Sequence, residues 1–313
     1  MTTPIVSKPQ EHGLGKEFGF SAYKSEDWSN YLANRPTYTP SFFQRIYDYH
    51  SQKAGASWSV AHETGAGCGV VSSVLAGSFD NVVVSDPNDG YVALARELLV
   101  ERAPFPESKF QFFQETSEES SVASKTVDLV AACECIHWTT PHLAIKEFWR
   151  ELKASGTLAI TYYTHPYIEG NERASKAWTA AFDVYSTKLQ DGVYARVPYI
   201  VNNALDGLEF PEEYWESVKR IYINTTGDTK CFMLKDVVTE SRVKESEEKI
   251  WTEDEDWCDT WGFDQFKGYY STWLPAVPES EVQDIWDELE RALEGKQVKI
   301  KTPLVVILAT KRT

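Results

Sequence analysis

The sequence has few cysteines, no long apolar run and no excess of basic residues. Its five cysteines are odd in number and scattered, which excludes a disulfide framework, and none has the spacing of a zinc site, so we expect no metal. The N-terminus lacks the basic-then-apolar pattern of a signal peptide, and no apolar run is long enough to span a bilayer. We therefore expect a cytoplasmic protein with reduced thiols and no membrane partner.

Basic residues are outnumbered, with 31 lysines and arginines against 47 aspartates and glutamates, for a net charge of −16. Such a charge opposes sequence-independent binding to a phosphate backbone, so we expect no nucleic-acid partner. The 313 residues are 42% hydrophobic, enough for the core of one large domain or of a domain with an insertion. This composition is compatible with a monomer or a homodimer.

The chain is organised around residues 58–69, Trp-Ser-Val-Ala-His-Glu-Thr-Gly-Ala-Gly-Cys-Gly. A short apolar run reaches an acid, glycines follow at alternate positions, and a helix-like stretch begins at Val70. This pattern predicts a strand, a tight loop and a helix. Glycine permits positive φ and close approach of a ligand, and the helix N-terminus offers free N–H groups. The alternative is a glycine-rich turn without a ligand.

Strands and helices alternate through residue 163. After the glycine loop we expect strands at 81–86, 109–114, 126–132 and 157–163, and helices at 91–103 and 141–152. This alternation predicts an α/β fold with a mostly parallel sheet, whose ligands bind at the carboxyl ends of the strands.

Asp86 ends the second strand, 17 residues after Gly69. An acid at this point of a nucleotide-binding α/β fold accepts hydrogen bonds from ribose hydroxyls. The alternative is that Asp86 caps the helix that follows it.

Five marks, in this order, resemble the class I S-adenosylmethionine-dependent methyltransferases, in particular the trans-aconitate methyltransferase-like group common in fungi. They are Tyr-x-x-x-Arg-Pro-x-Tyr at 31–38, the glycine run at 63–69, Asp86, His137-Trp138, and Arg-Glu-Leu-Lys-Ala-Ser-Gly-Thr-Leu-Ala-Ile at 150–160. The resemblance covers residues 18–163 well and the last strand weakly. It implies a Rossmann-like fold with a mostly parallel seven-stranded sheet, helices on both faces and a helical, aromatic lid.

This fold divides the chain into four parts. Residues 1–17 form a flexible tail, 18–163 form the S-adenosylmethionine-binding core, 164–215 and 230–280 form the substrate lid, and 216–229 and 281–313 return to the core.

The resemblance also implies a site. The residues expected to bind the cofactor are Glu63, Gly65, Gly67, Gly69, Asp86, Pro87, Glu115, Thr116, Cys133, Glu134 and Arg35. The residues expected to contact the substrate are Tyr23, Trp138, Tyr163, Arg196 and Trp273. The chain departs from the family at Glu115 and Thr116, where an acid-alanine pair is usual.

Methyl transfer from S-adenosylmethionine, with S-adenosylhomocysteine as product, mainly requires that a nucleophile be fixed in line with the methyl group. A carboxylate nucleophile needs no base but needs a cationic anchor, for which Arg35, Arg173 and Arg196 are candidates. A phenol, hydroxyl or thiol gains from a base, and His137 or His165 can serve. A histidine beside a tryptophan is also often only packed.

We therefore predict O-methylation of a carboxylic acid or another small molecule of secondary metabolism. The alternative is a cyclase or isomerase that uses bound S-adenosylmethionine as a fixed positive charge. The Gly-x-Gly-x-Gly spacing opposes a nicotinamide-dependent oxidoreductase, and the intact loop with Asp86 opposes a mere binding module. The identity of the acceptor does not follow from the sequence.

Overall fold

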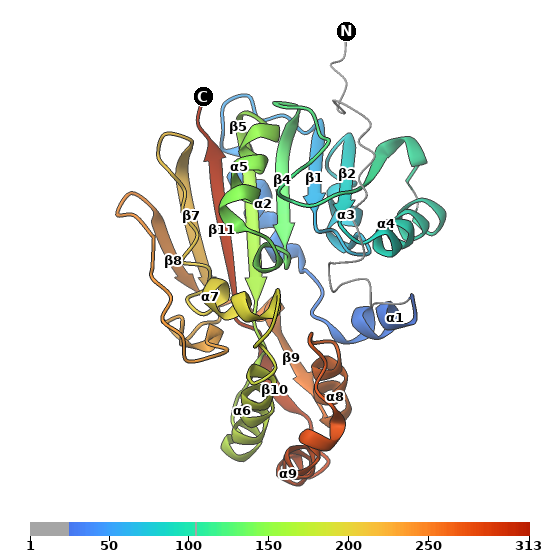
Figure 1. Cartoon of the computed structure of the whole chain (residues 1–313), viewed down its shortest axis with the longest axis vertical. Coiled ribbons are helices and arrows are strands. Elements are labelled where there is room, and N and C mark those ends of the chain that lie inside the picture. The colour runs from blue at the N-terminus through green and yellow to red at the C-terminus, as the bar shows by residue number, and fades with distance from the viewer. Residues whose placement is uncertain (1–24, 104) are drawn as a thin grey trace.

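A twisted sheet of eight strands forms the centre of the computed structural model, which describes residues 25–103 and 105–313 (Figure 1). The strand order is β3-β2-β1-β4-β5-β11-β7-β8, and of these strands only β11 runs antiparallel to its neighbours. Their bounds are β1 (Val60–Thr64), β2 (Asn81–Asp86), β3 (Phe110–Gln114), β4 (Val127–Cys133), β5 (Leu152–Tyr163), β7 (Trp215–Ile223), β8 (Glu248–Thr252) and β11 (Leu304–Lys311). The predicted α/β fold with a mostly parallel sheet is confirmed.

The sheet has one strand more than the predicted seven. The additional strand, β8, pairs in parallel with β7 at the edge of the sheet. Its side chains are exposed or half-buried: Ile250 packs on the core, and Trp251 stacks on the buried ring of Tyr222. A strand with so little buried apolar surface lacks the pattern by which buried strands are found in a sequence.

Helices cover both faces of the sheet, because successive strand residues point to opposite sides. Val82 and Val84 belong to one apolar cluster, with α2 (Pro40–Ser51) and α3 (Val70–Leu75), whereas Val83 belongs to the other, with α5 (Pro141–Glu151). The remaining core helix, α4 (Asp89–Arg96), continues as a π-helical turn to Glu101. No helix in the two described ranges is long and apolar enough to cross a membrane.

A second unit, which we call the helical subdomain, lies beyond the carboxyl ends of the parallel strands (Figure 1). It contains α6 (Glu172–Ser186), α8 (Phe263–Ser271), α9 (Gln283–Leu293) and an antiparallel sheet of β6 (Tyr167–Ile168), β10 (Val298–Lys301) and β9 (Cys258–Trp261). Helix α9 packs against α6 and α8, and α1 (Ser25–Asn34) packs against α8. Residues 283–301 therefore lie in this subdomain and not in the core, where we expected them, and β8 lies in the core sheet and not in the lid.

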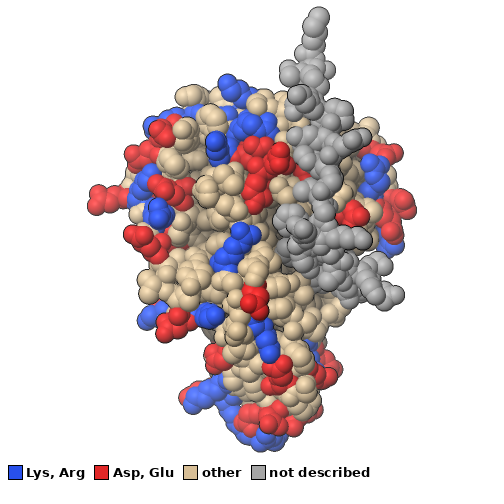
Figure 2. Space-filling model, viewed as in Figure 1, with Lys and Arg blue, Asp and Glu red and all other residues tan. Residues whose placement is uncertain are grey.

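On the face shown in Figure 2, the two units carry more charged side chains on their surface than the band between them. Acidic and basic side chains are interspersed over the sheet and at the far end of the helical subdomain (Figure 2). The band between the two units is mostly uncharged on this face (Figure 2). Short helical segments lie near this band in Figure 1, among them α7 (Val197–Val201).

Candidate active site

A cavity of about 620 Å³ lies where the strand ends face the helical subdomain. Its volume falls within the range of small-molecule sites. On the side of β1, β2 and β3 it is lined by loop residues, which we call the loop side: Glu63, Gly65 to Cys68, Asp86, Pro87 and Thr116 to Glu118. On the side of β4 and β5 it is lined mainly by rings, which we call the ring side: His137, Trp138, Tyr162, Tyr185, Arg196, Leu234 and Trp273.

The three glycines of the loop have different structural roles. Gly65, Gly67 and Gly69 all adopt positive φ, of 61°, 54° and 80°. A Cβ on Gly65 would lie 2.4 Å from the Cβ of Cys135, so the loop can pass β4 only without a side chain there. Gly69 is the residue before α3 and packs against Leu99, outside the cavity lining. Gly69 is therefore a structural residue, and our assignment of it to the cofactor is not supported.

Two buried carboxyl groups fix this loop. Glu63 accepts hydrogen bonds from the backbone N–H of Ser72, at 2.6 Å, and from its hydroxyl. Asp86 accepts from the backbone N–H groups of Gly67 and Asn88, each at 2.9 Å. Burial raises the pKa of Glu63 to about 7 and that of Asp86 to about 6. Both line the cavity, so Asp86 organises the backbone and faces the cavity at the same time.

The loop after β3 reaches the cavity through Thr116 to Glu118 and not through Glu115. The carboxylate of Glu115 is buried and accepts from the hydroxyl of Ser120 at 2.8 Å and from the N–H and hydroxyl of Ser121. Glu115 therefore shapes its own loop, which corrects its predicted place beside the cofactor. Thr116, the other predicted residue, lines the cavity.

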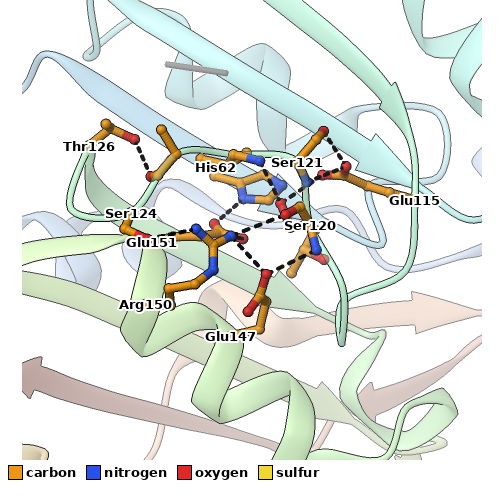
Figure 3. Close-up of polar contacts among 12 residues, drawn as sticks. His62, Glu115, Ser120, Ser121, Ser124, Thr126, Glu147, Arg150 and Glu151 are labelled. Atoms are coloured by element: carbon orange, nitrogen blue, oxygen red, sulfur yellow. Dashed lines mark hydrogen bonds and ion pairs between the residues drawn. The ribbon is translucent and has the colours of Figure 1, made fainter. Parts of the chain in front are cut away.

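A buried polar network holds this loop against the strands (Figure 3). His62 bonds Glu151 through Nδ1, at 2.6 Å, and Ser85 through Nε2, at 2.7 Å. Burial lowers the pKa of His62, but the carboxylate of Glu151 outweighs it, so the net shift is upward. Arg150 extends the network to Glu147 and to the carbonyl of Ser120. We did not single out His62 in the sequence, because its position inside an apolar strand carries no spacing signal.

The segment after β4 brings Cys133 and Glu134, both expected to bind the cofactor, to the cavity lining. Glu134 has a φ of 55°, uncommon for a residue with a side chain, and its carboxylate accepts from the backbone N–H of Tyr163. Burial raises the pKa of Glu134 to about 8. All four carboxyl groups of the lining thus accept a backbone N–H, since Glu118 accepts from Thr140 at 2.6 Å.

Arg35 joins the N-terminal segment to the helical subdomain. Its Nε donates to the hydroxyl of Thr272 at 2.8 Å and its Nη2 to the carbonyl of Thr272 at 3.1 Å. The guanidinium lies among aromatic rings, 4.9 Å from the ring centre of Trp273 and 5.3 Å from those of Tyr31 and Tyr269. Across the described ranges no carboxylate lies within ion-pair distance of it, although it lines the cavity.

On the ring side, His137 follows β4 in a short 3₁₀ turn, Ile136–Trp138. Its ring centre lies 4.5 Å from that of Trp138 and 5.1 Å from that of Tyr162. Burial, together with the charge of Arg35, lowers the pKa of His137 to about 3. This imidazole is therefore neutral at physiological pH.

Arg196 lies at the exposed rim of the cavity, where its Nη2 donates to the carbonyl of Trp138 at 3.0 Å. Like Arg35, it has no ion-pair partner among the described residues. The other residues expected at the substrate, Trp138, Tyr163 and Trp273, line the cavity, as does Pro87 of the cofactor set. Tyr23 lies outside the described residues.

Two candidates lie away from the cavity. His165 stacks on Phe182, with ring centres 3.9 Å apart, and its burial lowers its pKa to about 4. It is a packed residue of the helical subdomain, so it is not the base we considered. Arg173 is exposed and pairs with Glu288 at 2.5 Å, which removes it as an anchor for an acidic acceptor.

Some lining residues were missed, among them Tyr185 and Leu234. The hydroxyl of Tyr185 donates to the carbonyl of Leu274 at 2.7 Å, which presents its ring to the cavity. No local pattern distinguishes this tyrosine from the other 15 in the chain. In the described ranges no group of three or more histidines, cysteines or acids could hold a metal ion.

Comparison with known proteins agrees with this architecture. Residues 62–160 match the sequence family described as "Methyltransferase domain". Over this range the chain is similar to methyltransferases. It is an enzyme of the class I methyltransferase fold, and S-adenosylmethionine is its cofactor.

Fungal methyltransferases are similar to nearly the whole enzyme. Methyltransferase cfoB of Aspergillus candidus is 29% identical over 93% of this chain and 97% of its own length, and methyltransferase ptaI of Pestalotiopsis fici is 27% identical over 91% and 93%. A solved structure described as a type II methyltransferase, from Anaeromyxobacter dehalogenans, aligns over 88% of this chain and 97% of its own with a TM-score of 0.57. At 17% identity this last likeness concerns the fold alone.

Proposed function

We propose that this enzyme transfers the methyl group of S-adenosylmethionine to a carboxylate oxygen of a small acidic molecule, as in the trans-aconitate methyltransferase-like group. The observation that carries the proposal is the charge arrangement of the cavity. The two arginines of its lining, Arg35 and Arg196, lack an acid partner among the described residues, in a chain where acids outnumber bases. Arg35 is half-buried, where a cation without a counter-ion is costly, and Arg196 is exposed at the rim, where it can attract an anion. Two carboxylates, one from the donor and one from the acceptor, would supply the missing charges.

The donor fits the loop side. Asp86 keeps free lone pairs for the ribose hydroxyls after accepting two backbone N–H groups. Arg35 would hold the methionine carboxylate through its remaining N–H groups, and Glu63 and Glu134 would face the positive charges of the donor. When bound, S-adenosylmethionine supplies a methyl group on a sulfonium sulfur. The residues of this chain then have to hold the two reactants in line and keep water out.

The acceptor fits the ring side, which has mainly aromatic walls and whose nearest lining carboxyl group, Glu134, is bound to the backbone N–H of Tyr163. Trp138, Tyr162 and Trp273 offer apolar contact to a planar body, and Arg196 at the rim attracts an anion. Glu63, Asp86 and Glu134 have pKa values near enough to neutrality to accept a proton. They are bound to the backbone of the loop side or of β5, facing the donor. An acceptor that is already ionised needs none of them.

The test uses purified protein and S-adenosylmethionine labelled on its methyl group, with benzoate, cinnamate, 6-methylsalicylate and trans-aconitate as acceptors. We expect S-adenosylhomocysteine and a labelled methyl ester, which mild alkali hydrolyses to methanol. Arg196→Met should raise KM for the acid about 10-fold and leave the affinity for S-adenosylmethionine within about 2-fold.

Other outcomes would contradict the proposal. An alkali-stable methyl ether on 6-methylsalicylate would show a phenolic acceptor. Conversion of an acceptor without S-adenosylhomocysteine would favour the cyclase or isomerase alternative.

A further inference from the structure

The two ring nitrogens of His137 have different surroundings. Nδ1 is fully buried and has no hydrogen-bond partner in the part of the chain that the structure describes. The ring nevertheless lines the cavity. Its other nitrogen, Nε2, is not among the buried polar atoms that lack a hydrogen-bond partner. Contacts with Trp138 and Tyr162 fix the plane of the ring. The imidazole thus presents one nitrogen to a ligand and hides the other.

This asymmetry determines which nitrogen carries the proton. A neutral imidazole has one N–H donor and one lone-pair acceptor. An unpaired N–H is rare in protein interiors, whereas an unpaired acceptor is tolerated more often. The hidden Nδ1 is therefore the lone-pair nitrogen, and the proton belongs on Nε2. Nε2 then offers the cavity an N–H and no lone pair.

We propose that Nε2–H of His137 donates a hydrogen bond to one oxygen of the acceptor carboxylate and so turns the other oxygen toward the methyl group. The inference rests on the proposed function and gives His137 a role opposite to that of a base. The new bond joins the free carboxylate oxygen to the methyl carbon, the carbon–sulfur bond breaks, and its electron pair goes to sulfur. No proton is transferred in this step.

A substrate class follows from this role. The acceptor has to arrive ionised, because His137 offers it an N–H and no lone pair that could take a proton. Carboxylic acids, with a pKa near 4, meet this condition at neutral pH, whereas aliphatic alcohols do not. The walls of Trp138, Tyr162 and Tyr185 favour an acid with a flat, apolar body, so aromatic and cinnamic acids should be better acceptors than trans-aconitate.

Three substitutions separate this role from a structural one. His137→Gln places an amide N–H₂ at about the reach of Nε2, His137→Asn places it at the reach of Nδ1, and His137→Leu provides none. We expect the Gln variant to keep kcat/KM for the best acid of the panel within about 5-fold. The Asn and Leu variants should lose about 10- to 100-fold, as expected on losing a hydrogen bond to a charged group. Calorimetry should give all of them the affinity of the wild type for S-adenosylmethionine within about 2-fold.

The contrary results are equally definite. An Asn variant as active as the wild type, or a Gln variant as inactive as the Leu variant, would overturn the inference. So would faster transfer to an aliphatic alcohol than to any acid. If the wild type binds no S-adenosylmethionine, or makes an alkali-stable product, the proposed function fails, and these wild-type controls identify that failure separately.

A second measurement does not depend on the folding of a variant. Nitrogen-15 spectra of the S-adenosylhomocysteine complex report the tautomer of each of the six histidines, and the His137→Gln spectrum identifies the signal that disappears. We expect a neutral ring protonated at Nε2, and a shift of that proton on addition of benzoate. A ring protonated at Nδ1, or at both nitrogens at pH 7, would contradict the assignment.

Discussion

The loop side and the ring side of the cavity differ in how their polar groups are used. On the loop side each lining carboxylate already accepts a backbone N–H, so the surface is fixed before any ligand arrives. On the ring side the walls are aromatic, and the buried Nδ1 of His137 has no partner in the described ranges. The loop side is therefore a prearranged polar surface, which suits the donor of our proposal. The ring side offers shape and very few polar contacts, so under our proposal the acceptor can change there while the donor stays the same.

The strongest way to break the loop side is to disturb its backbone. Gly65→Ala adds a Cβ 2.4 Å from that of Cys135, at a φ of 61°. We expect a loss of about 3 kcal/mol in the free energy of unfolding, from overpacking and a left-handed backbone together. Gly170→Ala is the matched control, because its φ is 76° with no atom within 4 Å, and it should lose only about 1 kcal/mol. Urea unfolding curves measure both, and equal losses would show that the close approach to Cys135 is not a constraint.

The next largest effect is expected at Arg35, which we assign to the donor. Arg35→Met should weaken binding of S-adenosylmethionine about 100-fold, because a charge-assisted contact to its carboxylate is lost. Binding of 5′-methylthioadenosine, which lacks the amino-acid part, should change by less than about 3-fold. Calorimetry on both ligands tests this. A loss that affects both equally would mean that Arg35 only holds the helical subdomain in place through Thr272.

A smaller loss is expected at the ribose end. Asp86→Asn should weaken S-adenosylmethionine and 5′-methylthioadenosine alike, by about 10- to 30-fold, since both carry the diol. The same titrations give the answer, with a thermal unfolding curve to show that the loop is intact. If only S-adenosylmethionine were weakened, Asp86 would belong to the methionine end and the orientation of the donor on the loop side would be reversed.

The smallest expected effect is the release of a proton when the donor binds. Burial raises the pKa of Glu134 to about 8, so this carboxyl group is mostly protonated at pH 7 in the free enzyme. Positive charges of the bound donor should lower that pKa, so binding releases about half a proton to one proton at pH 7. Binding heats measured in phosphate and in Tris buffer should therefore differ, and should differ less for Glu134→Gln. Identical heats in the two buffers would place the donor's positive charges away from Glu134.

The sequence predicted the loop side better than the ring side for a physical reason. The glycine run and Asp86 lie at fixed distances along one strand–loop–helix–strand unit, so their spacing is a local property. Even there the side-chain directions were not predictable. Glu115 turns to Ser120 and Ser121, and Gly69 supports the helix, because packing within the loop and against Leu99 determines both.

The ring side is assembled from residues far apart in the chain. Trp138, Tyr185, Leu234 and Trp273 meet only after the helical subdomain has folded, and no spacing relates them. His165 was an equally reasonable candidate base in the sequence, yet it stacks on Phe182. The chain has 15 phenylalanines, 16 tyrosines and 11 tryptophans, so aromatic character alone does not distinguish a cavity wall from a core.

The position of β11 in the sheet has a consequence for how the enzyme is made. All eight of its residues are buried, and it pairs with β5 on one side and β7 on the other. During translation both neighbours are complete long before residues 304–311 leave the ribosome, and each then presents an unpaired edge. Such edges invite pairing with other chains. We infer that the nascent chain carries two open strand edges in the middle of its sheet until β11 is inserted between β5 and β7.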